Sequence, residues 1–240
     1  MLSLEHLFTI ESLLALATLT FLEIILGIDN IIFISIVTNK LPKAQQPKAR
    51  FIGLSLALIF RIILLMGIAY IIGLTKPLFN IFQHEVSWRD IILALGGLFL
   101  IAKSTSELHA KTTGIEHAHK ETKTAVFSTI IFQIVLLDIV FSFDSILTAI
   151  GLSNQIPIMV TAIVISIIVM MLFSGAISEF VNKHITLQIL ALSFLILIGF
   201  MLMIEAFHYH VPKGYIYFAV AFSLAVEVIN LRVRKSSSSE

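Results

Sequence analysis

Phe21 to Pro42 reads FLEIILGIDNIIFISIVTNKLP, and Leu136 to Pro157 reads LLDIVFSFDSILTAIGLSNQIP. The second stretch aligns with the first without a gap, at an offset of 115 residues. Polar positions coincide between the two: Glu23 with Asp138, Asp29 with Asp144, Asn30 with Ser145, and Asn39 with Asn154. Apolar composition alone does not place two acids six residues apart and a closing proline in register. The alignment therefore indicates an internal duplication.

The composition of the chain is that of a membrane protein. Hydrophobic residues make up 58% of the 240 residues and charged residues 13%, whereas soluble chains have about 45–50% apolar and about 25% charged residues. There is no cysteine, which excludes disulfides, thiolate metal sites and thiol nucleophiles. The net charge of +1 argues against a nucleic-acid partner.

Seven apolar segments are each long enough to span a bilayer as a helix, which takes about 20 residues. They lie near 7–39, 51–74, 88–108, 124–153, 157–182, 186–207 and 213–232. None shows the alternating polar face of a membrane β-barrel strand. We therefore predict an all-α integral membrane protein with seven transmembrane helices in one domain, residues 1–235, followed by a disordered tail at 236–240.

The basic residues predict how this domain is oriented. Twelve of the 16 follow the first, third, fifth or seventh segment, which places those ends in the cytoplasm and the N-terminus outside. Each copy of the duplication contains three helices, about 7–108 and about 124–207, and the helix at 213–232 is extra. Because three is odd, the copies have inverted topology, a pattern typical of secondary transporters.

Four acids lie at bilayer depth: Glu23, Asp29, Asp138 and Asp144. An acid at the centre of a membrane helix costs about 2.5–3.5 kcal/mol, so the set costs roughly 10 kcal/mol. A purely structural role would tie these acids to Arg61 and to backbone donors as polar packing. One arginine cannot balance four acids, so a functional role is favoured.

The residue types in the two stretches suit a hard divalent cation. Asn30 and Ser145 join the four acids as oxygen ligands, and neither stretch contains a histidine. Oxygen ligands favour Mn²⁺, Mg²⁺ or Ca²⁺, and surplus carboxylates suit proton exchange. On an unbroken helix Glu23 and Asn30 share a face with Gly27, whereas Asp29 is rotated by about 100° from Asn30. We therefore expect local unwinding at Gly27 to Asp29.

Other polar residues have more open roles. Arg61, deep in the second segment, is expected to contact Asp29 or Asp144 when no cation is bound, either as a counter-ion that withdraws or as a fixed structural pair. Glu227 is at most an accessory residue. His109, His117 and His119 lie in a predicted cytoplasmic loop, where they would collect a metal or simply be part of a polar loop.

At the two acidic stretches the sequence resembles the TerC family of integral membrane proteins. Glu23-x5-Asp29-Asn30 and Asp138-x5-Asp144-Ser145 match its two signature segments, and the likeness extends through 190–205 and 212–230. The resemblance implies metal-ion export, especially of manganese. It points to the branch whose members often carry CBS-type domains after the membrane unit, here without them.

These observations predict a transporter in the inner membrane of a bacterium that exports a divalent cation, Mn²⁺ first, in exchange for protons. It is not expected to be an enzyme or to hold a resident cofactor, and its partners are the bilayer, the cation, protons and, in a homo-oligomer, further copies of itself. The alternative is a non-transporting membrane scaffold, in which the four acids are replaceable. An intramembrane aspartyl protease fits less well, because Gly27-Ile28-Asp29 lacks the second glycine of a G-x-G-D element.

Overall fold

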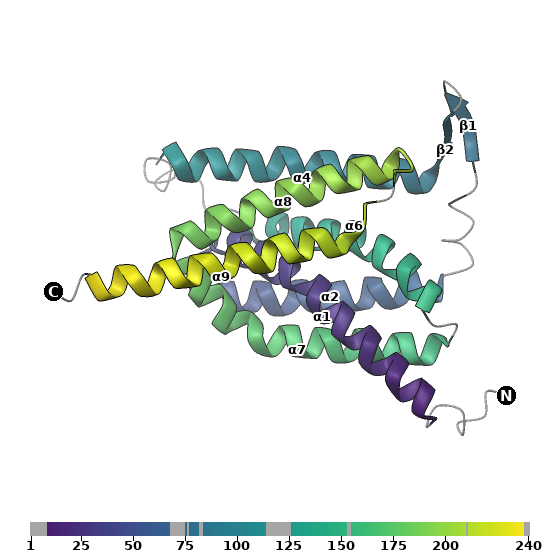
Figure 1. Cartoon of the computed structure of the whole chain (residues 1–240), viewed down its shortest axis with the longest axis horizontal. Helices are drawn as coiled ribbons and strands as arrows, with labels where there is room; N and C mark the ends of the chain where they lie inside the picture. The colour runs from purple at the N-terminus through teal and green to yellow at the C-terminus, as the bar shows by residue number, and fades with distance from the viewer. Residues whose placement is uncertain are drawn as a thin grey trace.

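The computed structural model describes residues 9–67, 75, 77–81, 84–113, 126–152, 155–209 and 211–237. Helices dominate this part of the chain (Figure 1): α1 (Ile10–Thr38), α2 (Gln46–Met66), α4 (Trp88–Thr113), α6 (Phe127–Leu152), α7 (Ile156–Lys183), α8 (Ile185–Ala206) and α9 (Lys213–Ser237). A short antiparallel hairpin of β1 (Pro77–Ile81) and β2 (His84–Ser87) precedes α4. The predicted helical membrane protein is confirmed, and the hairpin was not anticipated.

Several helices have the length and composition of membrane spans. Five of them, α1, α2, α4, α7 and α8, are long and apolar enough to cross a bilayer. In α6 and α9 the apolar stretches are shorter, Phe127–Phe143 and Gly214–Asn230. The count of seven spans therefore stays a prediction.

The observed ends of α2, α4 and α9 each differ from a predicted end by five residues. α2 begins at Gln46, five residues before the predicted start, because Pro47 is favourable in a first helical turn. α4 continues to Thr113, and an ion pair of 2.9 Å between Lys103 and Glu107, one turn apart, supports this polar extension. The loop predicted there is wrong: His109 is helical. His117 and His119 lie outside the described residues, as do 68–74 at the end of the second predicted segment.

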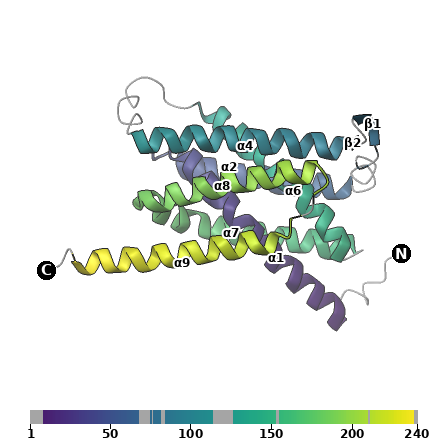
Figure 2. The ribbon, with the colours of Figure 1, turned by 45° about the horizontal axis from the view of Figure 1, so that its top comes forward.

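The helices pack in pairs. α1 lies along α7, α2 along α6 and α4 along α8, and α1 also contacts α6. Figures 1 and 2 show α4 beside α8, with α1 crossing the bundle obliquely and α9 along its edge. The start of α1 and the hairpin lie at one end of the bundle, and the end of α9 lies at the other.

α4 and α8 cross at a pair of glycines. A Cβ atom on Gly97 would lie 2.6 Å from the carbonyl oxygen of Gly199, and one on Gly199 would lie 2.9 Å from the oxygen of Gly97. The two backbones therefore touch at this point, which only glycine permits.

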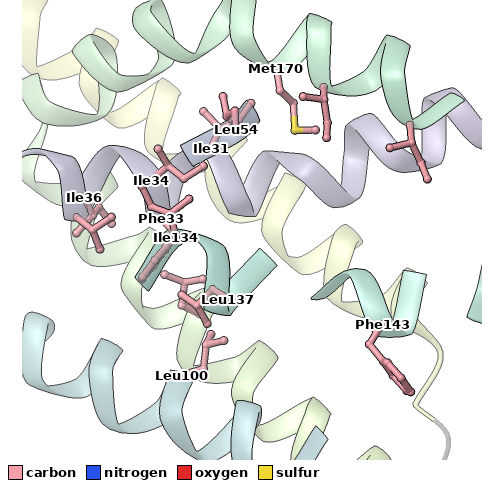
Figure 3. Close-up of a cluster of buried hydrophobic side chains, with 14 of the residues drawn as sticks. Ile31, Phe33, Ile34, Ile36, Leu54, Leu100, Ile134, Leu137, Phe143 and Met170 are labelled. Atoms are coloured by element: carbon pink, nitrogen blue, oxygen red, sulfur yellow. The ribbon is translucent and has the colours of Figure 1, made fainter. Parts of the chain in front are cut away.

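The main core lies between α1, α2, α6 and α7 (Figure 3). Val37, Leu65 and Ile134 are fully buried within it. One buried polar contact joins α1 to α7: the Ser35 hydroxyl donates to the Ser178 hydroxyl over 2.9 Å. This core surrounds the segment of α1 that carries the repeated acidic motif.

Candidate functional site

A buried arginine joins the two copies of the duplicated stretch. Arg61 Nη1 on α2 lies 2.6 Å from Glu23 Oε2 on α1, and Arg61 Nη2 lies 2.6 Å from Asp138 Oδ1 on α6. Arg61 Nε lies 3.2 Å from both carboxylate oxygens of Asp138. Glu23 and Asp138 are equivalent positions of the duplication, so one guanidinium binds the first acid of each copy.

The surrounding helices supply further donors to this cluster. Asn30 shares a face of α1 with Glu23, two turns away, and its Nδ2 lies 3.4 Å from Asp138 Oδ1. Ser142, one turn after Asp138 on α6, donates to Asp138 Oδ2 over 3.1 Å. The Ser145 hydroxyl donates to the Ser142 carbonyl over 3.3 Å and also interacts with the Glu23 carboxylate. Residues from both copies are therefore joined by hydrogen bonds.

This cluster is excluded from solvent. Relative exposures are 3% for Arg61, 5% for Glu23 and 6% for Asp138. Buried ion pairs lose hydration, and only close, multiple hydrogen bonds offset that cost. With both acids ionised, two negative charges face one positive charge. In that state the formal charge of the three groups together is −1.

The structure identifies the partners of Arg61 and corrects the expected break in α1. Arg61 does pair with acids of the predicted set, but its partners are Glu23 and Asp138. The side chains of Asp29 and Asp144 lie outside the described residues, so a contact to them stays a prediction. The expected unwinding is wrong: α1 is helical from Ile10 to Thr38. Gly27 instead serves close packing, because a Cβ there would lie 2.3 Å from Met170 Sδ.

A small cavity adjoins Glu23. Its volume is about 10 Å³, the scale of one water molecule. Apolar side chains of α1, α6 and α7 make up the rest of its wall: Leu19, Ile146, Met159, Ala162 and Ile163. The cavity therefore has room for about one water molecule, and Glu23 is the polar residue in its wall.

Two further buried acids, for which no role was predicted from the sequence, lie towards the ends of α4. Glu107 pairs with Lys40, just beyond α1, and with Lys103. Asp90 accepts from the Ser87 amide over 2.8 Å and lies 3.0 Å from His208 Nε2. The spacings Lys103-x3-Glu107 and Ser87-x2-Asp90, a helix pair and a capping motif, were the available signals.

Two predictions remain, a metal site built by the acids and an accessory role for Glu227. Within the described ranges, no three His, Asp or Glu side chains gather closely enough to hold a metal ion, although Asp29 and Asp144 could not contribute to that comparison. Glu227 is half-buried on α9, which packs against α8. Its accessory role stays a prediction.

Comparison with known families identifies the family of this chain. A family model described as "Integral membrane protein TerC family" matches residues 8–240. The chain belongs to the TerC family. No solved structure matches it.

Curated relatives of this chain are bacterial UPF0053 proteins, several of them named inner membrane proteins. The chain is 55% identical over 218 residues to the UPF0053 inner membrane protein YgdQ of Escherichia coli K12, covering 91% of this chain and 92% of the relative. It is 50% identical over 226 residues to a UPF0053 protein of Haemophilus influenzae, covering 94% and 95%. A third relative, YoaE of Escherichia coli K12, is 47% identical over 222 residues, which cover 92% of this chain and 43% of YoaE. The protein is thus a multi-pass membrane protein of this family.

Proposed function

We propose that this TerC protein exports a divalent cation, Mn²⁺ first, from the cytoplasm in exchange for protons. The ligands are the oxygen atoms of the duplicated motif: Glu23, Asp29, Asn30, Asp138, Asp144 and Ser145. The observation that carries the proposal is the Glu23–Arg61–Asp138 ion pair at the centre of the bundle. It brings the first acid of both copies to one point.

Arg61 acts as the counter-ion of the empty site. Its guanidinium lies between two carboxylates, the position in which a divalent cation would satisfy both. An arriving cation competes with the guanidinium for these oxygens, and a departing cation returns them to it. The two buried acids are therefore never left without a positive partner, which a low-dielectric site requires.

The packing of the helices supports two inverted three-helix repeats and one extra helix. Exchanging α1 with α6, α2 with α7 and α4 with α8 turns the α1/α7 contact into the α6/α2 contact. The same exchange turns the α1/α8 contact into α6/α4 and leaves α4/α8 unchanged. The crossing at Gly97 and Gly199 is thus a contact between the third helices of the two proposed repeats. Inverted repeats around a central site are the basis of alternating access.

The basic residues predict that the C-terminal end of the bundle faces the cytoplasm, and the start of α1 lies at the opposite end. Protonation of the acids from outside weakens their hold on the cation, and loss of those protons to the cytoplasm restores it. Inward proton movement is thereby coupled to outward cation movement.

Uptake of radiolabelled Mn²⁺ into inside-out vesicles tests this proposal. The cytoplasmic face of these vesicles is exposed to the medium, so export appears as accumulation in the lumen. We expect accumulation above that of vesicles lacking the protein, and faster accumulation when the lumen is acidic. Equal uptake with and without the protein would leave the scaffold alternative in place.

A further inference from the structure

α7 places a methionine sulfur beside the turn of α1 that follows Glu23. Gly27 lies one turn after Glu23, and the Sδ of Met170 fills the space that a side chain at Gly27 would occupy, 2.3 Å from the position of its Cβ. Met170 is 2% exposed. Figure 3 shows its side chain reaching from α7 towards α1.

A second methionine of α7 lies beside the preceding turn. Met159 lines the cavity of about 10 Å³ together with Glu23 and Leu19, which is one turn before Glu23. Met159 is also 2% exposed. Two methionines of one helix therefore lie near Glu23, one packed against Gly27 and the other in the wall of the cavity that Glu23 lines.

The sulfur of Met170 lies within the polar face of α1. Glu23, Gly27 and Asn30 share this face, and both of its polar residues reach the central pair: Glu23 contacts Arg61, and Asn30 contacts Asp138. Gly27 is between them. A sulfur atom seated on Gly27 is thus within one turn of two groups that the proposed function assigns as ligands.

The second copy of the motif holds an oxygen at the corresponding place. Ser142 is the equivalent of Gly27, and its hydroxyl donates to Asp138. The acid of the second copy is therefore accompanied by a hydroxyl from its own helix. In the first copy a thioether from another helix occupies that place, because glycine leaves it open.

This difference has a consequence for selectivity. Carboxylate, amide and hydroxyl oxygens bind Mg²⁺, Ca²⁺ and Mn²⁺ alike, whereas a thioether is a soft ligand that gains little from Mg²⁺ or Ca²⁺. We propose that Met170 is a specificity-determining residue, whose sulfur makes the Glu23 site prefer Mn²⁺ and similar transition-metal ions over Mg²⁺ and Ca²⁺. This inference rests on the proposed function, and Met159 supports the same preference from the other side.

The test is a pair of matched variants on adjacent residues. Met170→Leu removes the sulfur and keeps the volume, a change that cores tolerate well. Met171→Leu is the control, because this methionine is on the same helix but only half-buried and turned to another face. Binding of Mn²⁺ to the purified protein is measured alone and in competition with Ca²⁺ and with Mg²⁺.

We expect Met170→Leu to lower the preference for Mn²⁺ over Ca²⁺ about tenfold, which corresponds to about 1.4 kcal/mol, and Met171→Leu to leave it unchanged. An unchanged preference in Met170→Leu overturns the inference, since Mn²⁺ binding by the parent shows that the site itself is intact. Absence of Mn²⁺ binding by the parent protein overturns the proposed function as well, so the two failures are distinguishable.

A second variant covers the case in which Met170→Leu does not fold. Gly27→Ala keeps the methionine but adds a methyl group where the sulfur now lies. Because the end of a methionine side chain is flexible, the expected result is a displaced sulfur and the same loss of Mn²⁺ preference. A Gly27→Ala protein that retains the full preference contradicts the role of a sulfur seated on Gly27.

Discussion

Glu23 and Asp138, equivalent residues of the two repeated stretches, are bound by a single guanidinium, that of Arg61. The duplication therefore converges on one buried point, although its two acids are 115 residues apart in the chain. A site shared between repeats suits a protein that must expose it alternately to each side of a membrane. Substitutions of Arg61, Gly97 and Glu107 test the buried charges and the crossing of α4 and α8.

Arg61→Met should destabilise the metal-free protein and make its stability depend on metal. Removing one partner of a buried ion pair costs about 3–5 kcal/mol, because Glu23 and Asp138 are then left without a counter-charge. A bound divalent cation replaces that charge, and ligand at 100 times its Kd restores about 2.7 kcal/mol. Thermal unfolding of the purified protein with and without Mn²⁺ measures both effects.

The control for this measurement is the parent protein, in which Arg61 already neutralises the pair. Mn²⁺ should therefore raise the Tm of Arg61→Met by more than it raises the Tm of the parent. If the variant is destabilised and Mn²⁺ gives it no additional protection, the arginine is a fixed structural partner and not the counter-ion of a cation site.

Gly97→Ala should weaken the crossing of α4 and α8. The added methyl group would lie 2.6 Å from the Gly199 carbonyl oxygen, so the backbones must separate, and overpacking of this kind costs about 1–3 kcal/mol. Gly175→Ala is the control, because a Cβ there meets nothing within 4 Å. Unfolding in detergent should show a loss of stability for the first variant alone, and equal stability of both would contradict the observed backbone contact.

Glu107→Gln should separate the end of α1 from α4. The Glu107 carboxylate is buried between Lys40 and Lys103, and its neutralisation leaves two lysines facing a weaker acceptor, at a cost of about 1–3 kcal/mol. Glu179→Gln is the control, because Glu179 is an exposed acid near the C-terminal end of α7. The expected drop in Tm is confined to Glu107→Gln, and an equal effect of both substitutions would point to net charge instead of the ion pair.

Much of the site could be predicted from the sequence because acids at bilayer depth are costly and therefore conspicuous. The repeated spacing identified Glu23 and Asp138 as equivalent, and charge balance indicated that Arg61 pairs with acids of this set. What the sequence could not reveal was which acids: the partner depends on how α2 is rotated against α1 and α6, and apolar segments of this length carry little pattern from which to determine rotation.

The fold was harder to predict where local signals compete. On an unbroken helix Asp29 is rotated by about 100° from Asn30, and this favoured an interruption at Gly27 to Asp29. In the structure the helix is continuous and Gly27 makes room for Met170, a contact between residues distant in sequence. The extension of α4 past residue 108 was missed because hydropathy ends there, whereas the Lys103–Glu107 pair keeps the backbone helical. Hydropathy locates membrane spans but does not locate helix ends.

Mn²⁺-driven proton release is a direct measure of the proposed exchange of a divalent cation for protons. The protein is reconstituted with its cytoplasmic face towards the medium, Mn²⁺ is added, and the acidification of the medium is recorded for the parent and for four amide variants, Glu23→Gln, Asp29→Asn, Asp138→Asn and Asp144→Asn, with Glu179→Gln as control. We expect acidification by the parent and by the control. We expect none by Glu23→Gln or Asp138→Asn, because each removes a carboxylate of the shared site, and none by Asp29→Asn or Asp144→Asn. Acidification at the parent rate by folded Glu23→Gln and Asp138→Asn proteins would contradict cation–proton exchange at this site.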